Sequence, residues 1–328
     1  MVAGILEYAA VAIVYSLLAA VVLETLLYLW RVQAPPLALA FRLPVLAIPP
    51  LAPLLFPLLG VDREAESFRG QVALLDLRNW LGHDPSPLQP GWAVLLALMA
   101  ITTLLVALEV SSFVSHLLSR RRLAHHPLPP PKRLEQAWAS VADGKEAPAI
   151  LVVRGTAPTA YTIGLWRPAI LASTALVDKL DDEELQCVLA HEMAHAGRRD
   201  NWLGWLVFLF RCVSFYNPVS LFVSHQIHHD VERVCDWEAA QVTGKPLAMA
   251  SALLKVYGAS RPPATAKGLL SRFAPRGAAA LEHRARRALV EDRVRRLVHP
   301  ARTGTTSYPA LRLSLAVAGV LALAYLVV

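Results

Sequence analysis

The sequence predicts a mainly α-helical membrane protein, with about four transmembrane helices and a cytoplasmic α+β domain. Three observations predict this fold class. Hydrophobic residues make up 55% of the 328 residues and charged residues only 17%, whereas soluble domains carry about 25% charged residues. The apolar residues are concentrated in long runs. The longest polar segment, by contrast, alternates short β-rich runs with helical patterns.

Four apolar runs account for the expected spans. Residues 3–30, 92–118 and 309–328 each reach the roughly 20 residues that a helix needs to cross a bilayer. The run 35–60 is also apolar but contains seven prolines. Proline removes a backbone donor and bends helices, so we expect this span to be bent and packed against neighbours that bond its free carbonyls. Residues 1–118 then form an N-terminal membrane region.

The charges of the loops predict which side of the membrane each segment occupies. The stretch 119–133 carries five Arg and Lys, whereas loop 61–91 has five carboxylates against three arginines. Because positive charge beside a span stays cytoplasmic, we expect a domain of residues 119–308 in the cytoplasm and loop 61–91 outside. The net charge of +7 lies mostly next to spans. Attraction to anionic lipid explains it more simply than a direct nucleic-acid partner.

The cytoplasmic segment begins with strands and continues with helices. Three short β-rich runs separated by turn residues predict a small antiparallel sheet: residues 147–155, 160–165 and 167–173. Asp181, with Glu184 three residues later, has the spacing of a capping box, and apolar residues follow at helical spacing. We therefore expect one helix over about 182–197 and another over about 219–242.

The pentapeptide HEMAH lies on the first of these helices. His191 and His195 are four residues apart, so they share one helix face and can bind one metal ion. Glu192 lies beside the open coordination position, where it can take a proton from water. The pattern predicts a catalytic zinc site with one ion per chain and Glu192 as catalytic base. Such a site needs a third protein ligand.

The second helix offers candidates for this third ligand. Asn201 occupies the position where a histidine would complete HExxHxxGxxH. The stretch ERVCD instead supplies Glu232 as the expected ligand, and Asp236, one turn on, to hold a ligand histidine by its second ring nitrogen. His228, four residues before Glu232 on the same face, is the alternative. Cys235 is a soft ligand type, but its position points it elsewhere on the helix.

Several of these motifs together resemble a known family. HEMAHAGRRD, the NP at 217–218, ERVCD and the last apolar run look like the BlaR/MecR-type membrane metallopeptidases of bacterial antibiotic sensing. YTIGLWRPAIL also resembles the strand-turn-strand before the zinc helix of that family, and the resemblance covers nearly the whole chain. HtpX and the CAAX prenyl protease are more distant relatives. Signalling members continue past the last span into an external penicillin-binding sensor, and this sequence ends at Val328.

The resemblance implies a gluzincin-like zinc peptidase domain in a bacterial inner-membrane protein. It implies the following roles: His191, His195 and Glu232 as zinc ligands, Glu192 as catalytic base and Asp236 as the assisting catalytic residue.

The apolar run 202–223 follows the zinc helix directly, yet it cannot be a simple span. If it crossed the membrane, His191 and Glu232 would lie on opposite sides, and one zinc ion cannot bridge about 30 Å of hydrocarbon. The Asn-Pro pair at 217–218 favours a turn, and Arg211 disfavours contact with lipid. We therefore expect a membrane-associated hairpin that holds the site at the inner membrane surface.

These features predict a membrane-anchored zinc endopeptidase that acts at the cytoplasmic side in regulated proteolysis or signalling. The expected partners are the lipid bilayer and a protein substrate, such as a cytoplasmic repressor or a membrane protein. An edge strand near 150–154 is expected to hold extended substrate. Two alternatives stay open: a housekeeping quality-control or prenyl-type protease, and a non-catalytic signal-transducing scaffold with structural zinc. Glu192 disfavours the scaffold, because a structural site needs no base.

Overall fold

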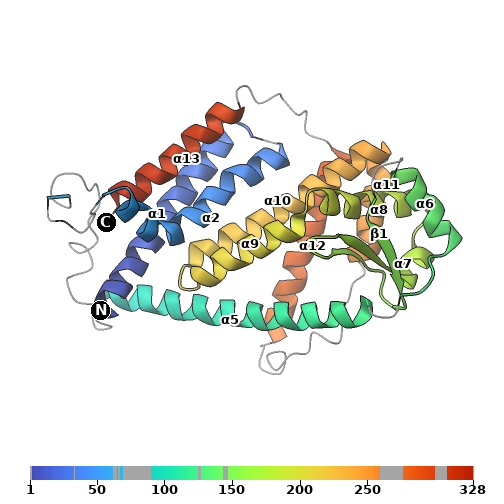
Figure 1. The fold of residues 1–328 in the computed structure, drawn as a ribbon, viewed down its shortest axis with the longest axis horizontal. Coiled ribbons are helices and arrows are strands. Elements are labelled where there is room, and N and C mark those ends of the chain that lie inside the picture. Colours follow the sequence, from blue (N-terminus) through green and yellow to red (C-terminus); the bar gives the residue numbers. More distant parts are fainter. Residues whose placement is uncertain are drawn as a thin grey trace. The chain divides into compact units, whose positions relative to one another are not determined.

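A computed structural model describes most of the chain as two compact units, each treated separately here (Figure 1). The helical unit comprises Met1–His116, Gly204–Val231 and Thr303–Val328, and the mixed unit comprises Leu117–Leu203 and Glu232–Arg302. The described residues are 2–32, 34–61, 65, 67–68, 90–124, 127–142, 147–258, 276–299 and 309–327. The expected external loop 61–91 lies mostly outside them.

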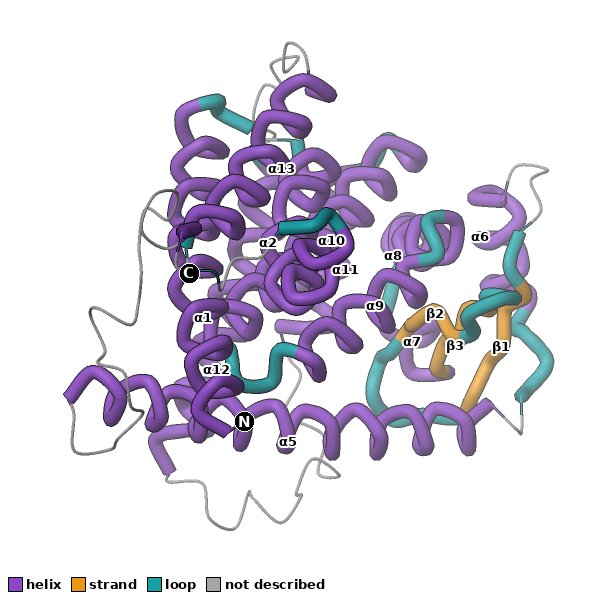
Figure 2. Tube along the Cα trace, turned by 60° about the vertical axis from the view of Figure 1, so that its left-hand side comes forward, coloured by secondary structure: helices purple, strands orange, loops and turns teal. Residues whose placement is uncertain are grey.

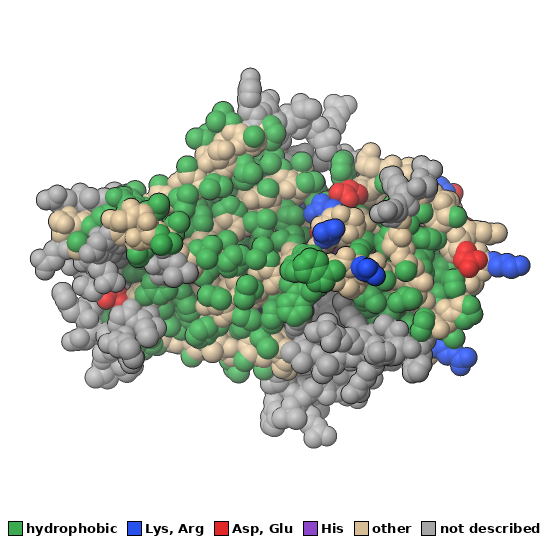
Figure 3. All heavy atoms as spheres, in the orientation of Figure 1, with side chains coloured by type: hydrophobic (Ala, Val, Ile, Leu, Met, Phe, Trp, Pro, Cys, Tyr) green, Lys and Arg blue, Asp and Glu red, His purple; other side chains and the backbone are tan. Residues whose placement is uncertain are grey.

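The four expected spans are present as long apolar helices. They are α1 (Val2–Leu29), α2 (Pro35–Leu58), α5 (Pro90–Ala124) and α13 (Pro309–Leu326), and each contains a stretch long and apolar enough to cross a membrane. Figure 3 shows apolar side chains over most of the face that these helices present there. Exposed apolar side chains include Leu17, Val21, Val94, Ile101, Leu104 and Leu311. Lipid suits such a surface better than water, so the chain is a membrane protein.

α2 shows how the helical unit accommodates proline inside an apolar helix. Pro53 has no N–H to donate to the carbonyl of Pro49, four residues earlier. The hydroxyl of Tyr8 in α1 donates to that carbonyl instead, at 2.8 Å. The expectation that a neighbouring helix bonds a free carbonyl of this span is confirmed at this position.

The apolar run 202–223 folds back on itself. α9 (Asp200–Val213) ends before a turn, and α10 (Pro218–Thr243) begins at the expected Asn-Pro pair. The Asn217 side chain accepts the N–H of Val219 and donates to the hydroxyl of Ser16 in α1, both at 3.0 Å. Tyr216 joins a buried cluster with Ala9, Tyr15, Phe56, Trp92 and Ala324. One side of the turn is therefore buried where α1 and α5 begin and α2 and α13 end, while Phe215 is exposed.

The mixed unit contains a three-stranded sheet that differs from the expected antiparallel one (Figure 2). Its strands are β1 (Ala149–Val153), β2 (Ala160–Ile163) and β3 (Ala169–Ser173), in the order β1-β3-β2. β2 and β3 form the expected antiparallel pair, but β1 is parallel to β3. The physical reason is burial. β3 is the most buried strand, and Ile170, Leu171 and Ala172 are fully buried, so β3 takes the centre and β2 takes an edge.

Helices surround this sheet and form the core with it. They are α6 (Lys132–Ala142), α7 (Thr174–Lys179), α8 (Asp182–Gly197), α11 (Pro246–Leu253), the π-helical segment η1 (Leu254–Gly258) and α12 (Arg276–Val298). α8 packs on β2 and β3 and also contacts α6 and α11. Leu176, Leu185 and Leu189 are fully buried between these elements. One face of α8 is thereby fixed against the sheet, which positions the HEMAH residues.

Candidate metal centre

α8 begins and ends where the sequence predicts. The Asp181 carboxylate accepts the N–H of Glu184, and the Glu184 carboxylate accepts the N–H of Asp181, each at 2.9 Å. These two bonds complete the expected capping box, which satisfies backbone donors that a helix start leaves free. The helix covers Asp182–Gly197. Within this helix, His191 and Glu192 are each only 4% exposed. The helical turn that carries these two candidate site residues is therefore buried.

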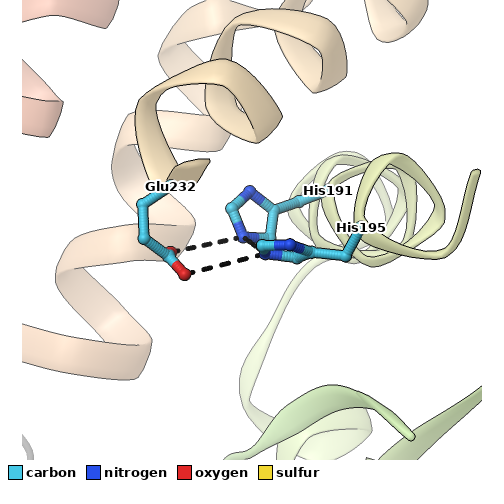
Figure 4. Close-up of side chains that lie close together, drawn as sticks. All are labelled: His191, His195 and Glu232. Atoms are coloured by element: carbon cyan, nitrogen blue, oxygen red, sulfur yellow. Dashed lines mark hydrogen bonds and ion pairs between the residues drawn. The ribbon is translucent and has the colours of Figure 1, made fainter. Parts of the chain in front are cut away.

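The structure brings His191, His195 and Glu232 together. Figure 4 shows the two imidazoles projecting from α8 toward the Glu232 carboxylate of α10. The two Nε2 atoms are 3.2 Å apart, and oxygens of Glu232 lie 3.6 and 3.7 Å from them. A tetrahedral zinc ion with bonds of about 2.0–2.2 Å separates its ligands by about 3.3–3.6 Å. The three groups therefore fit around one ion.

A carboxylate lies against the other ring nitrogen of each histidine. Nδ1 of His191 lies 3.0 Å from Oδ1 of Asp236, which is the contact that the sequence predicts. Nδ1 of His195 lies 2.9 Å from Oδ2 of Asp200, at the start of α9. A carboxylate at Nδ1 favours the tautomer that carries its proton there, and it leaves Nε2 free to bind metal. Both histidines thus present Nε2 to Glu232 and to each other.

The charges around the centre favour a cation. Burial disfavours a charged imidazole, but Asp236 and Glu232 outweigh that cost and raise the pKa of His191 to about 10. Burial also disfavours the charge on Glu232, yet His191, Arg293 and His195 hold the pKa of this carboxyl below its usual range. A metal ion that binds here must displace a proton, so binding becomes stronger as pH rises.

Glu192 is held by a hydroxyl from the sheet. Oγ1 of Thr162 in β2 lies 3.0 Å from Oε2 of Glu192 and 2.9 Å from its main-chain carbonyl. Next to Glu192 is a small pocket whose lining includes the apolar side chains of Val188 and Leu253 and the polar groups of Tyr257 and Arg293. The Glu192 carboxylate is held beside two potential metal ligands and next to a partly apolar pocket. It is therefore placed for proton transfer.

Arg293 of α12 contacts both carboxylates that α10 contributes. Its Nε and Nη2 donate to the two oxygens of Asp236 at 2.6 and 2.7 Å, and its Nη1 lies 3.0 Å from Glu232. The guanidinium also lies over the ring of Tyr257, 5.6 Å from its centre. A two-bond pairing fixes the plane of the Asp236 carboxylate, and therefore the oxygen that faces His191.

The other candidate ligands differ in their positions: His228 bonds its own helix, whereas Cys235 lies beside His195, so the expectation that Cys235 points away from the site is wrong. Nδ1 of His228 is 2.7 Å from the main-chain carbonyl of Ser224, one turn earlier. Among the described residues, the groups with metal-ligand spacing are His191 with His195 and Glu232, and His195 with Asp200 and Cys235. The Cys235 thiol lies 3.3 Å from Nδ1 of His195, a nitrogen that Asp200 already bonds. We interpret the second group as support for His195.

The strand beside the site is not the one expected. The open side of β1 is partly closed by a bridge from Leu128, whose N–H donates to Val152 at 2.7 Å. β2, at the opposite edge of the sheet, packs on α8 and carries Thr162. The expectation that an edge strand near 150–154 holds substrate stays a prediction; β1 is an edge of the sheet, but the order of the strands puts β2, the other edge, next to Glu192.

Comparison with known proteins identifies the family. A family model described as BlaR1 peptidase M56 matches residues 84–275, more than half of the chain. The chain belongs to the BlaR1 peptidase M56 family. The resemblance that the motifs carry is thereby confirmed, and the membership implies a metal at the site.

The curated relatives of this M56 chain are distant. Regulatory protein BlaR1 of Bacillus licheniformis is 28% identical over 86 residues, 26% of this chain and 14% of that protein. The methicillin resistance mecR1 protein of Staphylococcus aureus is 24% identical over 82 residues, 25% of this chain and 14% of that protein. A protease HtpX homolog of Tropheryma whipplei is 27% identical over 159 residues, 38% and 55% of the two chains. The chain thus spans a small part of the first two and about half of the third.

Four residues of the M56 site escaped the sequence analysis: Thr162, Asp200, Tyr257 and Arg293. Asp200 carried a usable signal, since it follows His195 by five residues at the start of a helix. Arg293 had none, because it is one of seven arginines in α12 and only folding selects it. Thr162 and Tyr257 lie on elements far from HEMAH in the sequence, so periodicity and spacing give no indication of their contact with the site.

Proposed function

We propose that this M56 chain is a membrane-anchored zinc endopeptidase that cleaves protein substrates at the cytoplasmic side of the membrane. The observation that carries the proposal is the placement of three metal-binding groups beside a buried glutamate. The Nε2 atoms of His191 and His195 and the carboxylate of Glu232 have the spacing of one zinc coordination sphere. Glu192 adjoins them and is held by Thr162.

Each residue has a role in the proposed reaction. The two histidines and Glu232 would hold a zinc ion, which would supply Lewis acidity toward the scissile carbonyl and water. Glu192 takes a proton from the attacking water and delivers it to the leaving amine. Asp236 and Asp200 keep the imidazoles in orientation. The outer edge of β2, where Asn201 donates to the carbonyls of Thr162 and Gly164, lies next to Glu192 and would align an extended substrate there.

The proposed topology follows from the loop charges. Spans at about 3–30, 35–60, 92–118 and 309–328 place the peptidase domain, within residues 119–308, at the cytoplasmic side of the inner membrane. Its hairpin at 202–223 enters the membrane region and returns to the same side. The hairpin turn is buried among the spans, so the peptidase domain is tied to the membrane region within its own sequence. Because the peptidase domain is connected to the membrane region in this way, we expect substrates close to the membrane, either a repressor or a membrane protein.

A second candidate function is housekeeping proteolysis of membrane proteins in the manner of an HtpX protease. The longer match to the HtpX homolog, 159 residues against 86 for BlaR1, favours it. The two candidates share the reaction and differ in substrate. Comparing the proteomes of cells that hold active or Glu192→Gln protein distinguishes them, since a single stabilised repressor indicates regulation and many stabilised membrane proteins indicate quality control.

Replacement of the base tests the reaction itself. Glu192→Gln preserves the size and burial of the side chain, so we expect stoichiometric zinc and a loss of peptide cleavage of about 10²–10⁴-fold. Zinc is measured by elemental analysis of the purified full-length chain. Glu183→Gln, on the same helix but 64% exposed, is the control and should cleave normally. Full cleavage by the zinc-loaded Glu192→Gln protein would contradict the mechanism.

A further inference from the structure

One arginine of the mixed unit connects the two carboxylates that α10 contributes to the metal centre. Nε and Nη2 of Arg293 in α12 donate to the two oxygens of Asp236, at 2.6 and 2.7 Å, and its Nη1 lies 3.0 Å from Oε2 of Glu232. The side chain of Arg293 is only 10% exposed. A buried guanidinium needs partners for its charge and for its N–H groups. The two carboxylates supply them, so the three side chains are fixed together.

Arg293 is itself held in place by its surroundings within the same unit. The residue before it, Asp292, pairs with Arg233 of α10 at 2.8 Å, so α10 and α12 exchange charges in both directions. The guanidinium lies over the ring of Tyr257, 5.6 Å from its centre. One turn further along α12, Leu297 is buried in an apolar cluster with residues of α11. The guanidinium is therefore a fixed point against which the α10 carboxylates are set.

This contact makes the two oxygens of Glu232 unequal. Oε2 lies 3.0 Å from Arg293 and 3.6 Å from Nε2 of His191, whereas Oε1 lies 3.7 Å from Nε2 of His195. A charge-assisted bond to Arg293 occupies electron density on Oε2 and leaves Oε1 as the stronger donor to a metal ion. Binding through one oxygen keeps three protein bonds and an open position for water. Binding through both oxygens would add a fourth protein bond.

We propose that Arg293 is a positioning residue for the metal centre and makes Glu232 bind the metal through one oxygen. It holds Oε2 of Glu232, while its paired bonds keep Asp236 against Nδ1 of His191. α12 is thereby part of the metal centre although it supplies no ligand. The proposal rests on the proposed function and names the residue that keeps a coordination position free for water.

The test follows the metal and not the cleavage rate. The purified full-length chain in nanodiscs is loaded with Co²⁺, because four-coordinate Co²⁺ absorbs visible light more strongly than Co²⁺ with a fifth bond. Zinc affinity is measured against a chelator. We expect Arg293→Ala to weaken the visible bands and to lower zinc affinity about 10–100-fold, the usual effect of losing support behind a ligand. Guanidinium ion, far below denaturing concentrations, should restore both, whereas ammonium, which lacks the planar fork, should not.

A neighbouring arginine provides the matched control. Arg296 lies on the same helix, pairs with Asp292 and is 48% exposed, so Arg296→Ala should leave the spectrum and the zinc affinity unchanged. If Arg293→Ala does not fold, Arg293→Lys, which keeps the charge but loses the paired bonds, replaces it with the same expected losses. A folded Arg293 variant with wild-type spectrum and affinity overturns the proposal, as does a loss that Arg296→Ala shares or that guanidinium fails to reverse. A wild-type chain that binds no metal overturns the proposed function instead.

Discussion

Two aspartates, Asp236 and Asp200, contact the Nδ1 atoms of the proposed metal ligands His191 and His195, at 3.0 and 2.9 Å. Because they act through the imidazoles, we expect Asp236→Asn and Asp200→Asn each to lower zinc affinity about 10–100-fold. Chelator competition on the purified chain measures this. Unchanged affinity in the Asp200 variant would show that Cys235 or solvent can replace its bond to His195.

The identity of the third ligand is also decided at the scale of single residues. Glu232→Ala should weaken zinc binding more than either aspartate variant, because it removes a group from the coordination sphere itself. His228→Ala should leave zinc binding intact, since the His228 imidazole bonds the carbonyl of Ser224 on its own helix. Zinc titration of the two variants side by side ranks them, and stronger loss in the His228 variant would reverse the assignment.

At the scale of elements, α8 depends on Glu184, a buried carboxylate. Burial disfavours its charge, but bonds from Lys255 and Ser251, both at 2.6 Å, and from the N–H of Asp181 outweigh that cost and lower its pKa. A carboxyl whose folded pKa lies below its unfolded value, about 4.3, stabilises the fold above that pH. This stabilisation is lost as pH falls through the folded pKa.

Glu184→Gln should therefore destabilise the mixed unit at pH 7 by about 1.5–3 kcal/mol, the range for hydrogen bonds to a charged group. The difference from wild type should shrink as pH falls below about 4. Thermal unfolding in detergent between pH 3 and 8 measures it. The neighbouring Glu183→Gln, which removes an exposed charge, should show a much smaller effect. A difference that stays constant with pH would mean that the charge of Glu184 is not the cause.

The elements also show where sequence patterns succeed and where they fail. The capping box and helical period fix α8, and Gly244, with a φ of +67°, ends α10 where the sequence predicts, because glycine adopts that conformation at little cost. The strand order could not be predicted in this way. Alternation and turn residues locate strands, but which strand takes the centre depends on the burial of β3 against α8.

For the whole molecule, the proposed topology makes a direct prediction. In a chain without its three cysteines, single cysteines near residue 75 and after 328 should label from outside intact cells. Cysteines near 145 and 245 should label only after permeabilisation. The reason is that positive charge at 119–133 keeps that side in the cytoplasm, and one metal site joins α8 to α10. External labelling at 245 with 145 protected would mean that the run 202–223 crosses the membrane.

The sequence by itself determined the four apolar helices, the position of α8 and the turn at Asn217, and it singled out His191, His195 and Glu232, whose side chains the structure brings together. All of these follow from local rules of composition, spacing and capping, which act within a few residues along the chain. Only the tertiary structure decided that β2 lies beside Glu192 and that Thr162, Asp200 and Arg293 contact the site. These contacts join residues from different elements, and most are far apart in sequence. They depend on which faces of the packed elements meet, and no local pattern records that.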